Sequence, residues 1–179
     1  MSLSRRDTLR LLLATATLAP FSAWAQEKSA RRSPKKGWAG NRPESAKQFG
    51  CTWWYAWGGS GKGTEGYEFV PMAKGNRQPV GSSELSQVSD STAKCLLGFN
   101  EPERTSQGNL TVAQAIEAWP LLVKFAEEKK LRLGSPSVSS DGGGGAWMRE
   151  FMEQAQRKKL RIDFVTAHWY RSADAGAFE

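Results

Sequence analysis

Two residues with the chemistry of a general acid site, Asn100 and Glu101, follow a short apolar run of the chain. This run, at 95–97, predicts a buried strand. Pro102 disfavours helical backbone at the residue before it, so we expect Glu101 to be extended and rigid at the strand end. A carboxyl group beside an amide suits general acid chemistry. The segment is also compatible with an ordinary surface glutamate before a turn, because connections often carry functional residues but are not reserved for them.

Strands that alternate with helices must position this carboxyl group. Apolar and aromatic runs predict five strands, at 50–57, 67–72, 94–99, 132–135 and 161–167. Thr111 and Gln114 form a capping-box pattern at the start of the clearest helix, and Pro120 should kink or split that helix. A second helix is predicted over 146–159, and 79–90 is interpreted as a loop with a short helix. The alternation is typical of an α/β fold with a parallel sheet.

The functional groups of parallel sheets gather at the carboxyl ends of the strands. Here those ends carry aromatic and hydrogen-bonding side chains around Glu101: Trp54, Tyr55, Trp57, Asn100, His168, Trp169 and Tyr170. Flat rings stack on the C–H faces of sugars, and amide, imidazole and phenol groups bond hydroxyls, so these residues suit a carbohydrate cleft. Core packing is the alternative for the aromatic residues and for His168. It is the preferred interpretation for Trp119 and Trp147, which lie on apolar helix faces.

Other chemistries lack their motifs in this sequence. We find no glycine-rich dinucleotide fingerprint and no Ser/His/Asp set with a nucleophile elbow. Cys51 and Cys95 are the only cysteines and His168 is the only histidine, so we expect no metal and no other cofactor. The two cysteines could pair in an oxidising compartment, whereas folding before export favours free thiols.

Residues 1–25 have the pattern of an export leader. Arg5 and Arg6 belong to a twin-arginine signature, an apolar run at 11–21 follows, and Ala-Trp-Ala at 23–25 is typical of a cleavage site. The apolar run is about half of the roughly 20 residues that a membrane span needs, and a short uncleaved anchor is the alternative. We therefore expect a bacterial periplasmic or secreted protein. It should contact the twin-arginine translocase during export, and it should not be bound to a membrane after the leader is cleaved.

The positive charge is concentrated near the N-terminus. The chain has 25 Lys and Arg against 18 Asp and Glu. Residues 1–42 hold nine of the basic and two of the acidic residues, which leaves sixteen of each in 43–179. The net charge of +7 therefore does not indicate a nucleic-acid partner. Residues 26–45, rich in Ser, Pro, Gly and basic residues, are predicted to be a disordered linker, and 46–179 to be the folded domain.

Six short segments together resemble glycoside hydrolase family 128, the glycosyl hydrolase catalytic core of the β-1,3-glucanases and of the fungal alkali-sensitive linkage protein. They occur in the family order, at 53–57 (WWYAW), 69–72 (FVPM), 97–102 (LGFNEP), 118–120 (AWP), 134–136 (GSP) and 163–170 (DFVTAHWY). The resemblance implies a (β/α)₈ TIM barrel that hydrolyses β-glucan, of β-1,3 linkage, by a retaining double displacement. It also implies Glu101 as acid/base, Asn100 as ligand of the sugar 2-hydroxyl, and His168 and Tyr170 as cleft residues.

The chain departs from the family pattern at three places. Ala56 and the pair Ala73-Lys74 stand where family members often carry an asparagine and an aromatic residue, so the identity of the glucan stays open. In the family the nucleophile lies on a later strand, and only about five of the eight barrel strands are visible here. We therefore expect 46–179 to be a partial catalytic domain that lacks its nucleophile. A non-catalytic glucan-binding protein and an inactive fragment are the alternatives.

Replacement of Arg5 and Arg6 by lysine should stop export, because the translocase recognises the arginine pair rather than its charge. We expect the precursor to accumulate in the cytoplasm of a bacterial host, whereas a control with Lys35 and Lys36 changed to arginine is exported. Cell fractionation and immunoblotting check this. Continued export of the lysine variant would indicate a general secretory signal instead.

Overall fold

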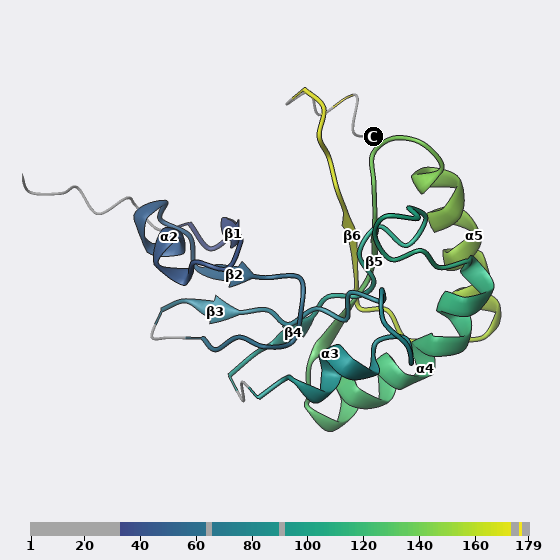
Figure 1. Cartoon of the computed structure of the whole chain (residues 1–179), viewed down its shortest axis with the longest axis horizontal. Helices are drawn as coiled ribbons and strands as arrows, with labels where there is room; N and C mark the ends of the chain where they lie inside the picture. The colour runs from purple at the N-terminus through teal and green to yellow at the C-terminus, as the bar shows by residue number, and fades with distance from the viewer. Residues whose placement is uncertain (1–32, 64–65, 90–91, 173–175, 177–179) are drawn as a thin grey trace, which may run out of the picture. The chain divides into compact units, whose positions relative to one another are not determined.

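Six short parallel strands form the framework of the part of the chain that the structure describes. This structure is a computed structural model, and it describes residues 33–63, 66–89, 92–172 and 176. The strands are β1 (Gly37–Ala39), β2 (Trp53–Tyr55), β3 (Glu68–Phe69), β4 (Cys95–Leu96), β5 (Arg132–Val138) and β6 (Phe164–Ala167). They form two three-stranded sheets, in the orders β1-β2-β3 and β4-β5-β6 (Figure 1). Every neighbouring pair is parallel, which confirms the expected α/β class with parallel strands.

Backbone pairing just beyond β3 and β4 joins the two sheets. Met72 and Leu97 form a parallel bridge. The Leu97 N–H donates to the Pro71 carbonyl at 2.9 Å, and the Ala73 N–H donates to the Leu97 carbonyl at 3.0 Å. The strands therefore follow one another in their sequence order, and their carboxyl ends lie along one edge.

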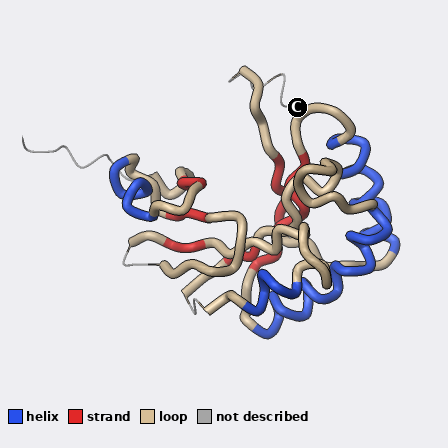
Figure 2. The backbone as a smooth tube through the Cα atoms, in the orientation of Figure 1, coloured by secondary structure: helices blue, strands red, loops and turns tan. Residues whose placement is uncertain are grey.

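Helices occupy the connections between the strands. They are α2 (Pro43–Gln48), α3 (Ser82–Ser86), α4 (Val112–Glu128) and α5 (Gly144–Arg157), drawn in blue in Figure 2. α4 and α5 both pack against β5. The capping box is confirmed, because Thr111 Oγ1 accepts from the Gln114 N–H at 3.2 Å and the Thr111 N–H donates to Gln114 Oε1 at 2.9 Å. In the described part of the chain, no helix is both long and apolar enough to cross a membrane.

The expected break at Pro120 is wrong, because α4 continues through Pro120 to Glu128. A proline here lacks the N–H that would bond the Ile116 carbonyl. Pro120 itself lies on the exposed face of the helix. On the other face Trp119 and Leu122 are fully buried, and this packing holds the helix on both sides of the proline.

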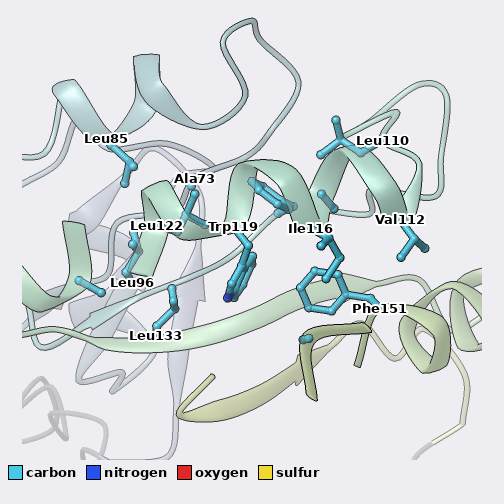
Figure 3. Packing of buried hydrophobic residues seen from close by; sticks show 14 of the residues in the cluster. Ala73, Leu85, Leu96, Leu110, Val112, Ile116, Trp119, Leu122, Leu133 and Phe151 are labelled. Atoms are coloured by element: carbon cyan, nitrogen blue, oxygen red, sulfur yellow. The ribbon is translucent and has the colours of Figure 1, made fainter. Parts of the chain in front are cut away.

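Trp119 lies in the middle of the main hydrophobic core, as Figure 3 shows. Its ring meets Phe99 and Phe151 edge-on, with ring centroids 5.6 and 5.1 Å apart. Its indole N–H donates to the Arg161 carbonyl at 3.0 Å. Trp147 stacks on Phe151 at 5.4 Å. The prediction that Trp119 and Trp147 belong to the core is therefore confirmed.

The prediction of a disordered linker over 26–45 is wrong for its described part, because residues 33–45 contain β1 and the start of α2. Two contacts anchor this polar segment. Trp38 stacks on Phe49 with centroids 5.2 Å apart, and Ala46 is fully buried in a second hydrophobic cluster with Cys51, Trp54 and Phe69. β1 also pairs with β2, so the described residues hold six strands rather than five. The predicted leader, 1–25, lies outside the described residues.

β5 is longer than the predicted strand at 132–135, because it runs through Pro136 to Val138. The register between β5 and β6 shifts between Gly134 and Ser137. Pro136 lies in this irregularity, where the ladder needs no N–H donor. The added length carries Ser137 and Val138 to the edge where the strands end.

Cys51 and Cys95 are free thiols, which confirms the alternative favoured by folding before export. Cys51 is buried, and Cys95 is partly buried at the start of β4. Burial is the largest of the effects that raise the pKa of Cys95 above its ordinary value, so this thiol is less readily ionised than a free cysteine.

Thr111→Ala should lower the free energy of unfolding by about 0.5–2 kcal/mol, because it removes the side-chain acceptor that caps α4. Thr105→Ala makes the same chemical change in an exposed turn and should alter it by less than about 0.5 kcal/mol. Urea unfolding followed by tryptophan fluorescence compares the two. Equal effects would show that the cap does not stabilise α4.

Candidate active site

Glu101 lies at the edge formed by the carboxyl ends of the strands, and its backbone is left-handed. Its φ is +39°, so the expected extended backbone is wrong. Pro102 favours extended backbone at the residue before it, but hydrogen bonds hold Glu101 in the left-handed region. The Glu101 N–H donates to the Ser137 carbonyl at 2.7 Å, and its carbonyl accepts from the Arg104 N–H at 3.0 Å. Such a backbone costs about 1–3 kcal/mol and persists only where the surroundings fix it.

The carboxyl group of Glu101 is largely buried and has two different neighbours. The residue is 8% exposed, and its Oε1 lies 2.8 Å from His168 Nδ1. Its Oε2 lies 3.7 Å from Arg104 Nε, which is too far for a hydrogen bond. One oxygen therefore has a partner that can exchange a proton with it, and the other lies near a fixed positive charge.

A pocket of about 250 Å³ lies over Glu101. Its walls come from four of the strand ends: Trp57, Lys74, Asn100, Glu101, Gln107, His168 and Tyr170. Asn100 Nδ2 donates to Gln107 Oε1 at 3.2 Å, which orients the amide. Among the described residues Asn100 Oδ1 is buried without a hydrogen-bond donor, so this acceptor suits a hydroxyl group of a ligand.

Trp57 and Tyr170 line this pocket, whereas Tyr55, which we also predicted as a substrate-binding residue, is not among its lining residues and lies against Trp57. Trp57 is 40% exposed and Tyr170 is 76% exposed, so both can contact a ligand in the pocket. The ring of Tyr55 meets that of Trp57 edge-on at 5.2 Å. Burial, and then the nearby Tyr170 and Glu101, raise the pKa of Tyr55 above its ordinary value. Tyr55 thus lies close enough to Glu101 to sense its charge.

Trp54 and Trp169, which we predicted as substrate-binding residues, do not line the pocket. Trp54 is 6% exposed and packs on Phe69 with centroids 4.7 Å apart. Successive residues of a strand point to opposite faces, so Trp54 faces the core and Tyr55 the other side of the strand. The indole N–H of Trp169 donates to the Ser172 carbonyl at 2.8 Å, beyond the pocket.

Sequence reasoning missed two residues of the site, Arg104 and Gln107. Lys74, which the sequence marks as a departure from the family pattern, lines the pocket. Gln107 and Arg104 lie in the turn after β4, and only the folded chain brings them back to Asn100 and Glu101. Turns have no sequence periodicity that would predict such contacts.

A larger cavity, of about 470 Å³, lies at the starts of β2, β3 and β4. Its acidic residue, Glu68, accepts from the Lys94 N–H at 3.0 Å and pairs with the Lys94 ammonium at 3.7 Å. Parallel sheets place their functional groups at the opposite, carboxyl ends, so the smaller pocket over Glu101 is the better candidate. In the described ranges no three His, Cys, Asp or Glu side chains converge as metal ligands.

Comparison with protein families identifies the chain. The family model described as "Glycosyl hydrolase catalytic core" matches residues 30–179. The chain therefore belongs to the glycosyl hydrolase catalytic core family, and it is related to the GH128 β-1,3-glucanases. This confirms the resemblance seen in the sequence. A comparison with curated proteins found no match.

Several solved GH128 structures are similar to the chain. A subgroup I endo-β-1,3-glucanase from Amycolatopsis mediterranei, in complex with laminaritriose, is 31% identical with a TM-score of 0.61, over 79% of this chain and 59% of that one. A curdlan-specific exo-β-1,3-glucanase from Blastomyces gilchristii is 30% identical with a TM-score of 0.60, over 74% and 60%. A subgroup II endo-β-1,3-glucanase from Sorangium cellulosum is 25% identical with a TM-score of 0.59, over 78% and 60%. The chain thus spans less than two thirds of the length of these structures.

Glu101→Gln should lower the pKa of Tyr55, because the negative charge of Glu101 helps to raise it. Ultraviolet titration of tyrosine ionisation measures the shift, with Tyr55→Phe identifying which of the three tyrosines is followed. Glu153→Gln, which makes the same change on the exposed face of α5, should leave the titration unchanged. An unaltered titration in Glu101→Gln would contradict the proximity of the two groups.

Proposed function

We propose that the pocket binds β-1,3-glucan and that Glu101 is the acid/base of a retaining hydrolysis. The observation that carries this proposal is the buried carboxyl group of Glu101, hydrogen-bonded to His168 and surrounded by exposed aromatic rings and an unpaired amide acceptor. The relatives that bind laminari-oligosaccharides support the choice of substrate.

Glu101 performs two proton transfers in this proposal. In the first step of a retaining reaction it protonates the oxygen of the leaving sugar, and in the second it takes a proton from the attacking water. His168 Nδ1, at 2.8 Å, orients the carboxyl group by bonding one oxygen. The second oxygen then faces the pocket, where the glycosidic oxygen would lie.

The other pocket residues position the sugar. Asn100 Oδ1 accepts a hydrogen bond from the 2-hydroxyl, because Gln107 already occupies the Nδ2 side of the amide. Trp57 and Tyr170 present rings on which a sugar can stack. Lys74 brings a cation to the same pocket, where an aromatic residue is frequent in the family, and it would donate to ring hydroxyls instead of stacking.

A retaining mechanism requires a second carboxylate about 5 Å from the first. Of the described residues that line the pocket, Glu101 alone carries a carboxyl group. Glu103, two residues away, bonds Ser139 through Oε1 instead. We therefore propose that the nucleophile lies outside the described residues, within a complete (β/α)₈ barrel of which β1 to β6 form successive strands.

Glucan binding without hydrolysis is the second candidate function. The observation that favours it is the same single carboxyl group, since a pocket of aromatic rings and hydrogen-bonding groups suffices for binding. We propose that the protein acts after export in either case, because residues 1–25 carry the twin-arginine pattern.

In a protein that includes the proposed nucleophile, Glu101→Gln should reduce laminarin hydrolysis by about 10²–10⁴-fold, because it removes the proton donor, and should leave the affinity for laminarihexaose nearly unchanged. Reducing-sugar release and isothermal titration calorimetry measure the two effects. Glu117→Gln, on the exposed face of α4, is the matched control and should retain both properties.

The same measurements separate the two functions. A wild-type chain that binds laminarihexaose but releases no sugar is a glucan-binding protein. A chain that does neither contradicts both candidates. Hydrolysis at the wild-type rate by Glu101→Gln would remove Glu101 from the mechanism.

A further inference from the structure

A guanidinium group lies close to Glu101 without forming a hydrogen bond to it. Arg104 Nε is 3.7 Å from Glu101 Oε2, beyond the range of an N–H···O bond. The same Nε is buried, and in the described part of the chain it has no hydrogen-bond partner. Guanidinium–carboxylate hydrogen bonds are among the strongest in proteins, so a restraint must hold Arg104 at this distance.

Asp141 provides this restraint. Its Oδ1 bonds Arg104 Nη2. The bond is the main cause that lowers the pKa of Asp141 and raises that of Arg104 relative to their ordinary values. Arg104 lies in the turn after β4 and Asp141 in the connection after β5, so this ion pair joins two neighbouring strand ends.

The connection after β5 is fixed from both sides, so Asp141 cannot follow Arg104 toward Glu101. On the β4 side, the N–H and hydroxyl of Ser139 donate to Glu103 Oε1 at 2.8 and 2.6 Å. On the β6 side, Ser140 Oγ accepts from the Tyr170 N–H at 3.3 Å. The two residues before Asp141 are therefore bonded to the strand ends on either side, and these bonds hold Asp141 in place.

We propose that Asp141 is a positioning residue for Glu101: it holds Arg104 away from the carboxyl group and leaves His168 as the hydrogen-bonding partner of Glu101. The inference rests on the proposed acid/base role of Glu101. A guanidinium bonded directly to a carboxylate favours its ionised form, whereas a general acid has to carry a proton to the leaving oxygen. Imidazole can either donate or accept a hydrogen bond, so it is compatible with both protonation states.

The groups that face Glu101 come from the ends of several strands. They are Tyr55 after β2, Lys74 after β3, Arg104 after β4, and His168 and Tyr170 after β6. Glu103 also acts on Arg104 through its charge, but its Oε1 is occupied by Ser139. Asp141 is thus the carboxylate that decides where the guanidinium group lies.

The single histidine of the chain makes a direct test possible, because its imidazole is the one bonded to Glu101. In the full chain with isotope-labelled histidine, Asp141→Asn should shift the imidazole nitrogen resonances at one fixed pH near neutrality. The released Arg104 then bonds Glu101 and weakens the bond to His168. The double variant Arg104→Gln/Asp141→Asn should show the same resonances as Arg104→Gln alone, since no guanidinium is left for Asp141 to hold.

Three controls separate positioning from a general effect on the fold. Asp141→Glu keeps the charge and should retain the wild-type spectrum. Glu153→Gln removes the carboxylate of an exposed ion pair with Arg157 on α5 and should shift nothing. In a Glu101→Gln background, Asp141→Asn should add no further shift. Thermal melting of each variant shows whether it is folded, and the Asp141 side chain is 64% exposed, which makes the substitution mild.

Unshifted resonances in folded Asp141→Asn would overturn the inference, and so would a shift between Arg104→Gln and the double variant. These measurements need no glucan and no turnover. Laminarin hydrolysis by wild type and Glu101→Gln decides the proposed function separately, so a failure of one can be distinguished from a failure of the other.

Discussion

The site depends on one backbone hydrogen bond, from the Glu101 N–H to the Ser137 carbonyl at 2.7 Å. This bond continues the pairing of β4 with β5 beyond the end of β4 and fixes Glu101 against β5. It exists only because β5 continues past Pro136, which the irregular register between β5 and β6 permits. The next residue along β5, Val138, accepts from the His168 N–H at 3.0 Å. Adjacent carbonyls of one strand thus position the carboxyl group and the imidazole that bonds it.

The sequence patterns predicted the elements whose side chains repeat at a regular period. The apolar stripe and capping box of α4, the short helix α3 and the segments of the later strands follow from local residues alone, and so does the placement of Glu101 and His168 at strand ends. The strand β1 could not be predicted in this way. It has three residues, within a polar segment, and it is held by its pairing with β2 and by the stacking of Trp38 on Phe49. Those are contacts between segments, which composition does not report.

The candidate site shows the same division between local and non-local information. The aromatic run at the end of β2 predicted a ring-lined cleft, but the pleat of the strand decides which rings reach it, and Trp54 faces the core. The network around Glu101 joins residues distant in the sequence, such as Arg104 with Asp141 and Glu103 with Ser139. Such pairs become visible only when parallel strands bring their ends together.

Backbone strain gives an independent indication of where function resides. Among the residues that the structure describes, five that are not glycine have positive φ: Trp57, Glu101, Asn109, Lys130 and Lys159. Lys130 and Lys159 directly follow the C-caps of α4 and α5, and the hydrogen bonds there are those of Schellman motifs, which use this conformation to end a helix.

Asn109 is of a residue type that tolerates the left-handed region. Trp57 and Glu101 have neither explanation, and both line the same pocket. Strain of about 1–3 kcal/mol per residue persists only where the surrounding structure fixes it. Helix ends and residue type therefore explain the positive φ of three residues but not that of Trp57 and Glu101. The remaining backbone strain lies at the two strand ends that carry the Trp57 ring and the Glu101 carboxyl group of the candidate site.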